Sequence, residues 1–364
     1  MKKLRLLLSF DHELSLGGAD SYANNMFDPT DRLIDLADEL DVPITLFTDV
    51  CCAIRFRRWD ARGFFDPFRR QVEVAIDRGH DVQLHLHPHW MDTEYRDGRF
   101  FPARTYSLGD FHDREWPNNI SGIVQQGVEL LNELCRPVRP DYRCVAFRAG
   151  GCSMAPRTTE ILEALYENGI RIESSIAKGF QYGCELWKVD YRNMPGSANW
   201  FISPSGPLNR EATSGLYEIP IAARPRTPVN NIPFLFKRVL YRNRQYATGG
   251  RSIDVGATSV IDKLKRLAPH STWMLGFDNH TESVADVMRT LKSHIRSHSQ
   301  EDEITCSVIS HPKFMGDYAR SVMKSFVERV RAEFCDRVSF CNYQQFYYDF
   351  LSVRGCAEDA IGGV

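Results

Sequence analysis

The feature that most constrains the fold is a regular alternation of short apolar runs with amphipathic helical patterns. Leu4–Phe10 is a compact apolar run, whereas Asp31–Leu40 repeats its apolar residues every three or four positions, as a helix with one buried face does. Further strands are predicted at Ile44–Thr48, Asp81–Leu86, Cys144–Phe147, Ile170–Ile172, Leu216–Ile219, Trp273–Phe277, Thr305–Ile309 and Val338–Cys341. Further helices are predicted at Phe68–Arg78, Ser121–Leu134, Arg157–Asn168, Ser283–His298 and Tyr318–Phe334. This alternation predicts an α/β fold with a parallel sheet or barrel and helices outside it.

Two segments interrupt the alternation. Residues 91–117 are rich in Asp, Arg, Gly and aromatic residues, and residues 177–252 in Pro, Gly, Asn and Arg. Loops of this length are usually functional or disordered. We expect one catalytic domain over residues 1–350 that carries both segments as insertions above its site, followed by a tail at 351–364. A simple insertion without function is the alternative.

Composition excludes several classes of protein. A formal net charge of -2 gives no strong field of either sign, so a nucleic-acid partner is not expected. The apolar run after Lys2 and Lys3 is too short for a signal peptide, and no stretch approaches the ~20 apolar residues of a membrane span. Ten cysteines at irregular spacing, with no CxxC pair, predict reduced thiols and a cytoplasmic location.

Ionisable residues appear abruptly where three predicted strands end, the edge at which parallel α/β folds place their sites. In the first group, Asp11 and Glu13 point to one side of the strand and His12 to the other. Two buried carboxylates on one face are costly unless a cation lies between them. They therefore indicate a divalent metal, although a helix-capping Asp with a solvated Glu is the alternative.

The second group is His85-Leu86-His87-Pro88-His89. Neutral imidazole is the commonest nitrogen ligand of zinc. If the chain turns helically after His85, then His85 and His89 share a face; if it stays extended, all three histidines do. Pro88 cannot continue a central strand, and this favours the turn, with His85 and His89 as the ligand pair.

Two further strand ends carry candidates. His311 follows Thr305–Ile309 and can serve as a general acid or base near neutral pH, or as a simple cap. Arg148 follows Cys144–Phe147 and can hold a carboxylate ionised through a bidentate contact, or lie on the surface. Gly150 suits a turn with close substrate approach.

In chain order, these groups resemble the motifs of the polysaccharide deacetylases, the NodB-type carbohydrate esterases. Ser9-Phe10-Asp11-His12-Glu13 resembles the first motif with its two acids separated by one residue. Gly79-His80-Asp81 leading to His85 and His89 resembles the second, and Phe147-Arg148 the third. Glu173-Ser174-Ser175 resembles an Asp-Ser-Ser motif, and Ser310-His311-Pro312 the fifth motif.

The resemblance implies a distorted (β/α) barrel of about seven strands and a divalent metal, usually zinc. It assigns Glu13, His85 and His89 as metal ligands, with His12 and His87 outside the metal site. It also assigns the catalytic roles: Asp11 as base, Arg148 as its partner and His311 as the acid that protonates the leaving amine. The implied reaction is hydrolysis of an N-acyl group, most simply acetyl, on an amino sugar. A nucleotide- or lipid-linked precursor suits a cytoplasmic enzyme.

Candidate substrate contacts follow from the same motifs and from the insertions. Gly150, Glu173 and Ser174 lie in the motif segments. Trp187 and Trp200 offer apolar faces to a pyranose ring. Arg192 and Arg210 are further candidates, for binding a phosphate group. The alternative is that these aromatic residues only pack the insertions onto the barrel.

Three other readings remain open from the sequence. Two histidines and one carboxylate also suit ferrous iron in an oxygenase. A barrel with altered motifs could bind sugar without hydrolysis, although pure binding needs neither Asp11 nor His311. A deformylase, or an amidase on a substrate other than a sugar, shares the same chemistry.

Overall fold

The computed structural model describes residues 3–227, 233, 236–244, 249–252 and 272–352. Its core is one nine-stranded sheet in the order β10-β11-β7-β6-β3-β2-β1-β14, with β15 also paired to β1. All pairs are parallel except β10 with β11. The strands are β1 (Lys3–His12), β2 (Ile44–Asp49), β3 (Asp81–Leu86), β6 (Ala146–Ala149), β7 (Ile172–Glu173), β10 (Trp200–Ile202), β11 (Leu216–Glu218), β14 (Glu303–Ser310) and β15 (Val338–Phe340).

The sheet is curled, and a short bridge joins its two sides. Ile221, just after β11, forms a parallel bridge with Ser307 of β14. The bridge is held by hydrogen bonds from Ser307 N to Pro220 O (3.0 Å) and from Ala222 N to Ser307 O (2.9 Å). The α/β class and the curled sheet agree with the prediction, and the number of barrel strands stays a prediction.

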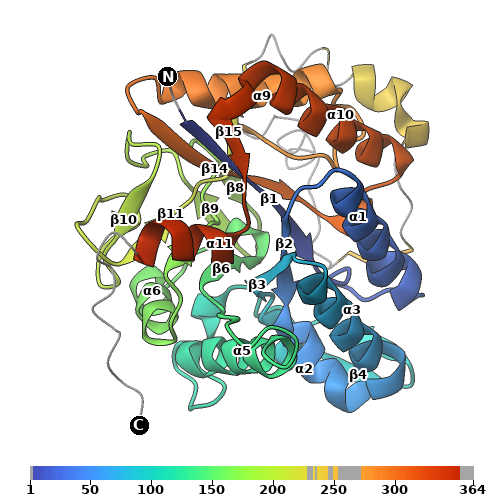
Figure 1. Cartoon of the computed structure of the whole chain (residues 1–364). Helices are drawn as coiled ribbons and strands as arrows, with labels where there is room; N and C mark the ends of the chain where they lie inside the picture. Colours follow the sequence, from blue (N-terminus) through green and yellow to red (C-terminus); the bar gives the residue numbers. More distant parts are fainter. Residues whose placement is uncertain (1–2, 228–232, 234–235, 245–248, 253–271, 353–364) are drawn as a thin grey trace.

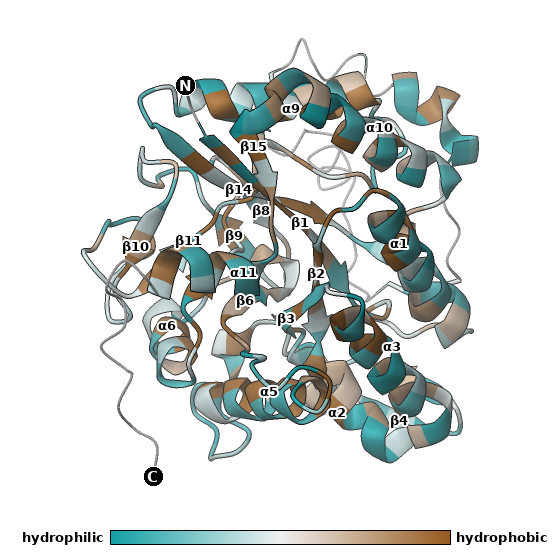
Figure 2. Ribbon diagram, viewed as in Figure 1, coloured by the Kyte–Doolittle hydropathy of each residue, from teal (hydrophilic) through white to brown (hydrophobic). Residues whose placement is uncertain are grey.

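Helices cover the outside of the sheet (Figure 1). They are α1 (Asp28–Glu39), α2 (Val50–Trp59), α3 (Asp66–Asp77), α4 (His89–Asp92), α5 (Ile120–Cys135), α6 (Thr158–Glu167), α9 (Val284–Ser297), α10 (Asp317–Phe334) and α11 (Tyr343–Phe346). Hydrophilic and hydrophobic residues alternate along them, as in α3 and α10 (Figure 2), because one face of each packs on the sheet. β1 is buried along almost its whole length, which explains its nearly continuous apolar sequence.

The structure confirms most of the predicted elements within a few residues and changes two. Trp273–Phe277 was expected to be a strand of the main sheet, but β13 (Thr272–Met274) pairs antiparallel with β12 (Ala223–Pro225) in a separate two-stranded sheet. The sequence analysis did not predict α2, which begins directly after β2 and buries Cys51, Cys52 and Phe56. Arginines interrupt its apolar pattern.

Both long segments contain ordered structure. Residues 91–117 form a hairpin of β4 (Glu94–Arg96) and β5 (Arg99–Phe101). Residues 177–252, as far as the structure describes them, contain a hairpin of β8 (Gln181–Gly183) and β9 (Lys188–Asp190), besides β10, β11 and β12. The single-domain boundaries stay a prediction. Among the described residues, no helix is both long and apolar enough to cross a lipid bilayer.

Candidate active site

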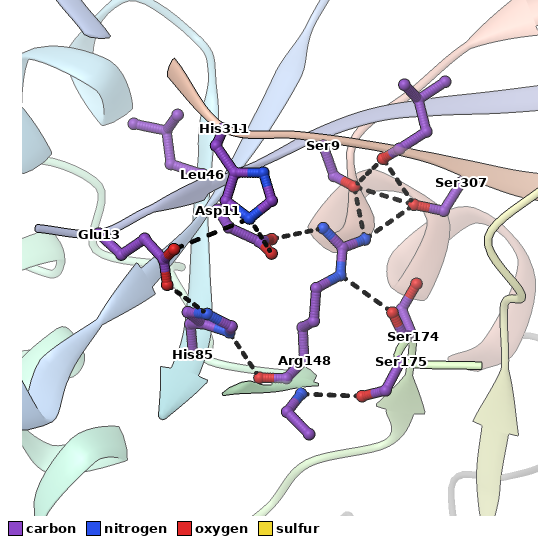
Figure 3. A network of polar contacts seen from close by, with 12 residues as sticks. Ser9, Asp11, Glu13, Leu46, His85, Arg148, Ser174, Ser175, Ser307 and His311 are labelled. Atoms are coloured by element: carbon purple, nitrogen blue, oxygen red, sulfur yellow. Dashed lines mark hydrogen bonds and ion pairs between the residues drawn. The ribbon is translucent and has the colours of Figure 1, made fainter. Parts of the chain in front are cut away.

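Polar side chains gather at the carboxyl ends of the parallel strands. The strand register pairs Asp11 of β1 with Phe47 of β2, and it pairs His85 of β3 with both Asp49 of β2 and Arg148 of β6. Neighbouring parallel strands therefore bring residues that are far apart in the sequence to one edge of the sheet. Asp11, Glu13, His85, Arg148 and His311 all meet there (Figure 3).

Arg148 is fully buried and anchors Asp11. Its Nη1 donates to Asp11 Oδ1 at 2.7 Å. Its Nη2 donates to Ser9 Oγ at 2.7 Å and to Ser307 Oγ at 3.0 Å, and its Nε donates to Ser174 O at 3.0 Å. Burial by itself would raise the pKa of the Asp11 carboxyl, but Arg148 and two nearby histidines together lower it. The guanidinium thus keeps Asp11 ionised and fixes one of its oxygens.

Glu13, His85 and His87 form a buried cluster with metal-ligand spacing. His85 Nε2 lies 3.2 Å from Glu13 Oε2 and 3.1 Å from His87 Nε2, and His87 Nε2 also contacts Glu13 Oε2. Ligand atoms bound about 2.0–2.1 Å from a tetrahedral zinc ion lie about 3.3 Å apart. His85 Nδ1 donates to the carbonyl oxygen of Arg148 at 2.8 Å, which directs its Nε2 lone pair into the cluster. The donor set therefore fits a divalent metal.

The structure places His87, and not His89, beside Glu13 and His85. The chain stays extended past His85, so the side chains two positions apart share a face, and the helical turn begins only at His89 in α4. His89 Nε2 instead donates to Leu16 O at 3.0 Å. Burial, then the charge of His87, lowers the pKa of His89 to about 3. The geometry therefore supports His85 and His87 as the ligand pair. It does not support the predicted pair of His85 and His89 or the predicted exclusion of His87.

His311 faces both carboxylates. Its Nε2 lies 3.6 Å from Asp11 Oδ2 and 3.7 Å from Glu13 Oε1. Its Nδ1 bonds to Asp278 Oδ2 at 2.7 Å, and its backbone N donates to the same oxygen at 3.2 Å. Burial by itself would lower the pKa of His311, but the bond to Asp278 and the nearby carboxylates raise it. The ring is therefore held in one orientation and disposed to carry a proton.

Lys313 is a buried cation that the sequence analysis did not identify. It lies in the short turn after β14, and its Nζ donates to Glu13 Oε1 at 2.7 Å. Burial by itself would raise the pKa of Glu13, but Lys313, and then the two histidines of the cluster, hold it well below its usual range. Only its position, two residues after His311, could have pointed to it.

A cavity of about 430 Å³ opens onto these groups. Asp11, Glu13, His87 and His311 line one part of it. Its other walls are largely aromatic and include Tyr106, Phe180, Trp187 and Trp273. Trp187 stacks on Tyr106 with ring centroids 4.2 Å apart. Asp278, Glu282 and Arg226 add polar groups. The volume is that of a small-molecule site with an apolar lining and a few polar contacts.

Only some of the candidate substrate contacts reach the cavity. Trp187 lines the cavity, whereas Trp200 is buried in β10 with its Nε1 on Leu208 O at 3.2 Å. Glu173 and Ser174 are buried in the sheet interior. Gly150 leaves room for the His87 ring, because a Cβ at residue 150 would lie 2.7 Å from His87 Nδ1. His12, which was expected to lie outside the metal site, bonds to Gln71 at 2.8 Å, and Arg192 pairs with Asp190 at the surface.

No protein-family model matches the sequence, and no curated protein matches it. Solved structures do match. A Mycobacterium smegmatis protein assigned as a polysaccharide deacetylase superposes with a TM-score of 0.51 at 14% identity, over 97% of this chain and 92% of that one. Puue allantoinase and a Pseudomonas aeruginosa PAO1 protein, also assigned as a polysaccharide deacetylase, each give 0.46 at 12% identity, over 96% and 92%. The chain thus shares the α/β fold of the Mycobacterium smegmatis protein.

Proposed function

We propose that the chain is a metal-dependent hydrolase that removes an N-acyl group, most simply acetyl, from an amino sugar. The observation that carries the proposal is the arrangement of Asp11. Its Oδ1 is held by Arg148, and its Oδ2 faces His311 beside the cluster of Glu13 and two histidines. A fixed base, a histidine positioned to donate a proton and a metal-ligand cluster on one cavity are the groups that amide hydrolysis needs.

Glu13, His85 and His87 would hold the metal, and zinc is the ion that hydrolytic sites with one carboxylate and two imidazoles use. A bound zinc ion would lower the pKa of a water molecule and polarise the acyl carbonyl. The assignment of His87 in place of His89 rests on the contacts of His87 Nε2 with Glu13 Oε2 and with His85 Nε2.

Asp11 would accept the proton of the attacking water. Arg148 occupies Oδ1 at 2.7 Å, so Oδ2 is the oxygen that faces the cavity and takes the proton. A carboxylate in this role contributes typically about 10²–10⁴-fold to the rate. Because the guanidinium holds the charge in a buried site, Asp11 is ionised before substrate arrives.

His311 would protonate the departing amine. Its Nδ1 is bonded to Asp278, which leaves Nε2 to carry the proton toward the cavity. The two carboxylates near Nε2 stabilise the charged ring. Asp278 acts as a positioning residue, and it holds the imidazole as the acidic partner in a Ser-His-Asp triad does.

The cavity favours a small acylated amino sugar over an extended polymer. A volume of about 430 Å³ matches a ligand of one or two rings. Trp187 and Tyr106 present stacked aromatic faces of the kind that pack on a pyranose ring. We infer a precursor, nucleotide- or lipid-linked, that meets the enzyme in the cytoplasm. A formyl group or an amide without a sugar would use the same chemistry.

Acyl release from a panel of substrates tests this proposal. Acetate and formate would be measured from N-acetyl and N-formyl amino sugars, free, nucleotide-linked and lipid-linked, with protein loaded with zinc or with ferrous iron, each under air and under argon. We expect release from at least one amino sugar at the same rate in both atmospheres, and none with Asp11→Asn. Oxygen-dependent turnover would favour the iron oxygenase, and sugar binding without release would favour a non-catalytic barrel.

A further inference from the structure

Asp11 and Glu13, two of the buried carboxylates at the site, each have a fixed cation. Asp11 pairs with Arg148 at 2.7 Å, and Glu13 pairs with Lys313, also at 2.7 Å. The side chains of Lys313 and Glu13 are only 5% and 6% exposed. A buried charge is tolerated only when it is paired. The Lys313 ammonium therefore stabilises Glu13 when no other cation is near.

The two oxygens of Glu13 have different partners. Oε2 faces His85 and His87, and Oε1 faces the Lys313 ammonium. A divalent ion held through Oε2 and the two imidazoles would lie on the same carboxylate as this ammonium. A divalent and a monovalent cation on one buried carboxylate repel each other, and water and salt screen this repulsion less than they would at the surface. The Lys313 ammonium therefore disfavours the binding of a divalent metal by Glu13, His85 and His87.

We propose that Lys313 is a tethered competitor of the metal: its ammonium neutralises Glu13 in the metal-free protein and weakens the binding of a divalent ion there. This inference rests on the proposed function only in taking Glu13, His85 and His87 as the ligands. Its consequence is an exchangeable metal. The ion can leave without unfolding the site, because Lys313 then compensates the charge of Glu13.

If Lys313 instead orients Glu13, its ammonium strengthens metal binding, and the experiment distinguishes this effect from competition. A hydrogen bond to a ligating carboxylate can also orient it, and removal of such partners commonly costs ~10–100-fold in metal affinity. Competition and orientation therefore predict changes of opposite sign when the ammonium is removed. Structural damage alone would also weaken binding, so a gain in affinity is specific to competition.

The experiment is calorimetric titration of zinc chloride into chelator-treated full-length protein. We expect Lys313→Met to bind zinc at least about tenfold more tightly than wild type, which corresponds to about 1.4 kcal/mol. Lys313→Arg keeps the charge and is expected to stay near wild type. Lys178→Met is the matched control, because Lys178 is a half-buried lysine that bonds to Pro195 O at 2.8 Å, outside the cluster.

Thermal melting supplies the second measurement. Metal-free Lys313→Met is expected to melt below wild type, since Glu13 has lost its partner, and zinc is expected to raise its Tm more than that of wild type. Zinc binding by Lys313→Met that is equal to or weaker than that of wild type overturns the inference and leaves the hydrolase proposal standing. If no variant, wild type included, binds zinc, the metal assignment falls and the inference falls with it.

Discussion

Arg148 and Asp11 form a buried ion pair that uses only one carboxylate oxygen, Asp11 Oδ1, at 2.7 Å. The other oxygen, Oδ2, lies 3.6 Å from His311 Nε2. The pair thus separates two requirements of a general base: one oxygen is anchored, and the other is left for proton transfer. This division makes Asp11 the sharpest point at which to test the mechanism.

Asp11→Asn is expected to lower kcat by about 10²–10⁴-fold while zinc binding stays within about threefold of wild type. The amide keeps the size of the carboxylate but cannot accept the proton. Steady-state acyl release measures kcat, and zinc titration of the same preparation measures the zinc affinity. A variant with a near-normal rate would remove Asp11 from the mechanism.

Gly150→Ala is expected to weaken zinc binding by at least about tenfold by displacing His87. The new Cβ would lie 2.7 Å from His87 Nδ1 and 2.5 Å from Leu86 O, closer than either contact allows. Gly196→Ala is the matched control, since a Cβ there meets no atom within 4 Å. Equal zinc affinity in both variants would contradict the placement of His87 among the ligands.

Trp187→Ala is expected to raise KM by about tenfold, because the Trp187 ring lines the cavity and stacks on Tyr106 at 4.2 Å. Zinc binding should be unchanged. Trp200→Ala is expected instead to lower the Tm, since Trp200 is buried in the sheet. Trp116→Ala, at a 66% exposed position, serves as the neutral control. An unchanged KM in Trp187→Ala would mean that the ring only packs the insertions together.

His294 is expected to make the protein sensitive to mild acid. Burial, and then the charges of His298 and Lys178, lower the pKa of His294 to about 3, whereas an unfolded histidine has a pKa of about 6.5. The unfolded state therefore binds more protons below pH 6.5, and stability is lost as the pH falls from 6.5 toward 3. At pH 5 this amounts to about 2 kcal/mol.

His294→Gln should reduce the drop in Tm between pH 7 and pH 5. His112→Gln replaces a partly exposed histidine and should leave that drop as in wild type. If both variants kept the full drop, another group would be responsible for the acid sensitivity.

The sequence was sufficient to predict that Asp11, Glu13 and His85 gather at one edge of the sheet, because apolar strands that end in ionisable residues are visible in a single chain. The sequence was not sufficient to predict which histidines face Glu13, because that depends on the local backbone conformation. Whether the chain after His85 turns or stays extended depends on contacts of the turn with Leu16 and Gly150, and Pro88 allows both. Asp278 and Lys313 were missed for a different reason. Each acts through one distant partner, His311 or Glu13, and pairing across the fold leaves no periodic signal.

The stacked pair of Tyr106 and Trp187 joins residues 91–117 to residues 177–252, and the two rings lie about eighty positions apart in the chain. Both rings line the same cavity, so neither segment shapes that side of the cavity alone. A larger or smaller side chain at one position would leave a clash or a gap unless the other position changed with it. A change of substrate preference should therefore require compensating replacements at both positions, and a replacement at one position alone should only weaken substrate binding.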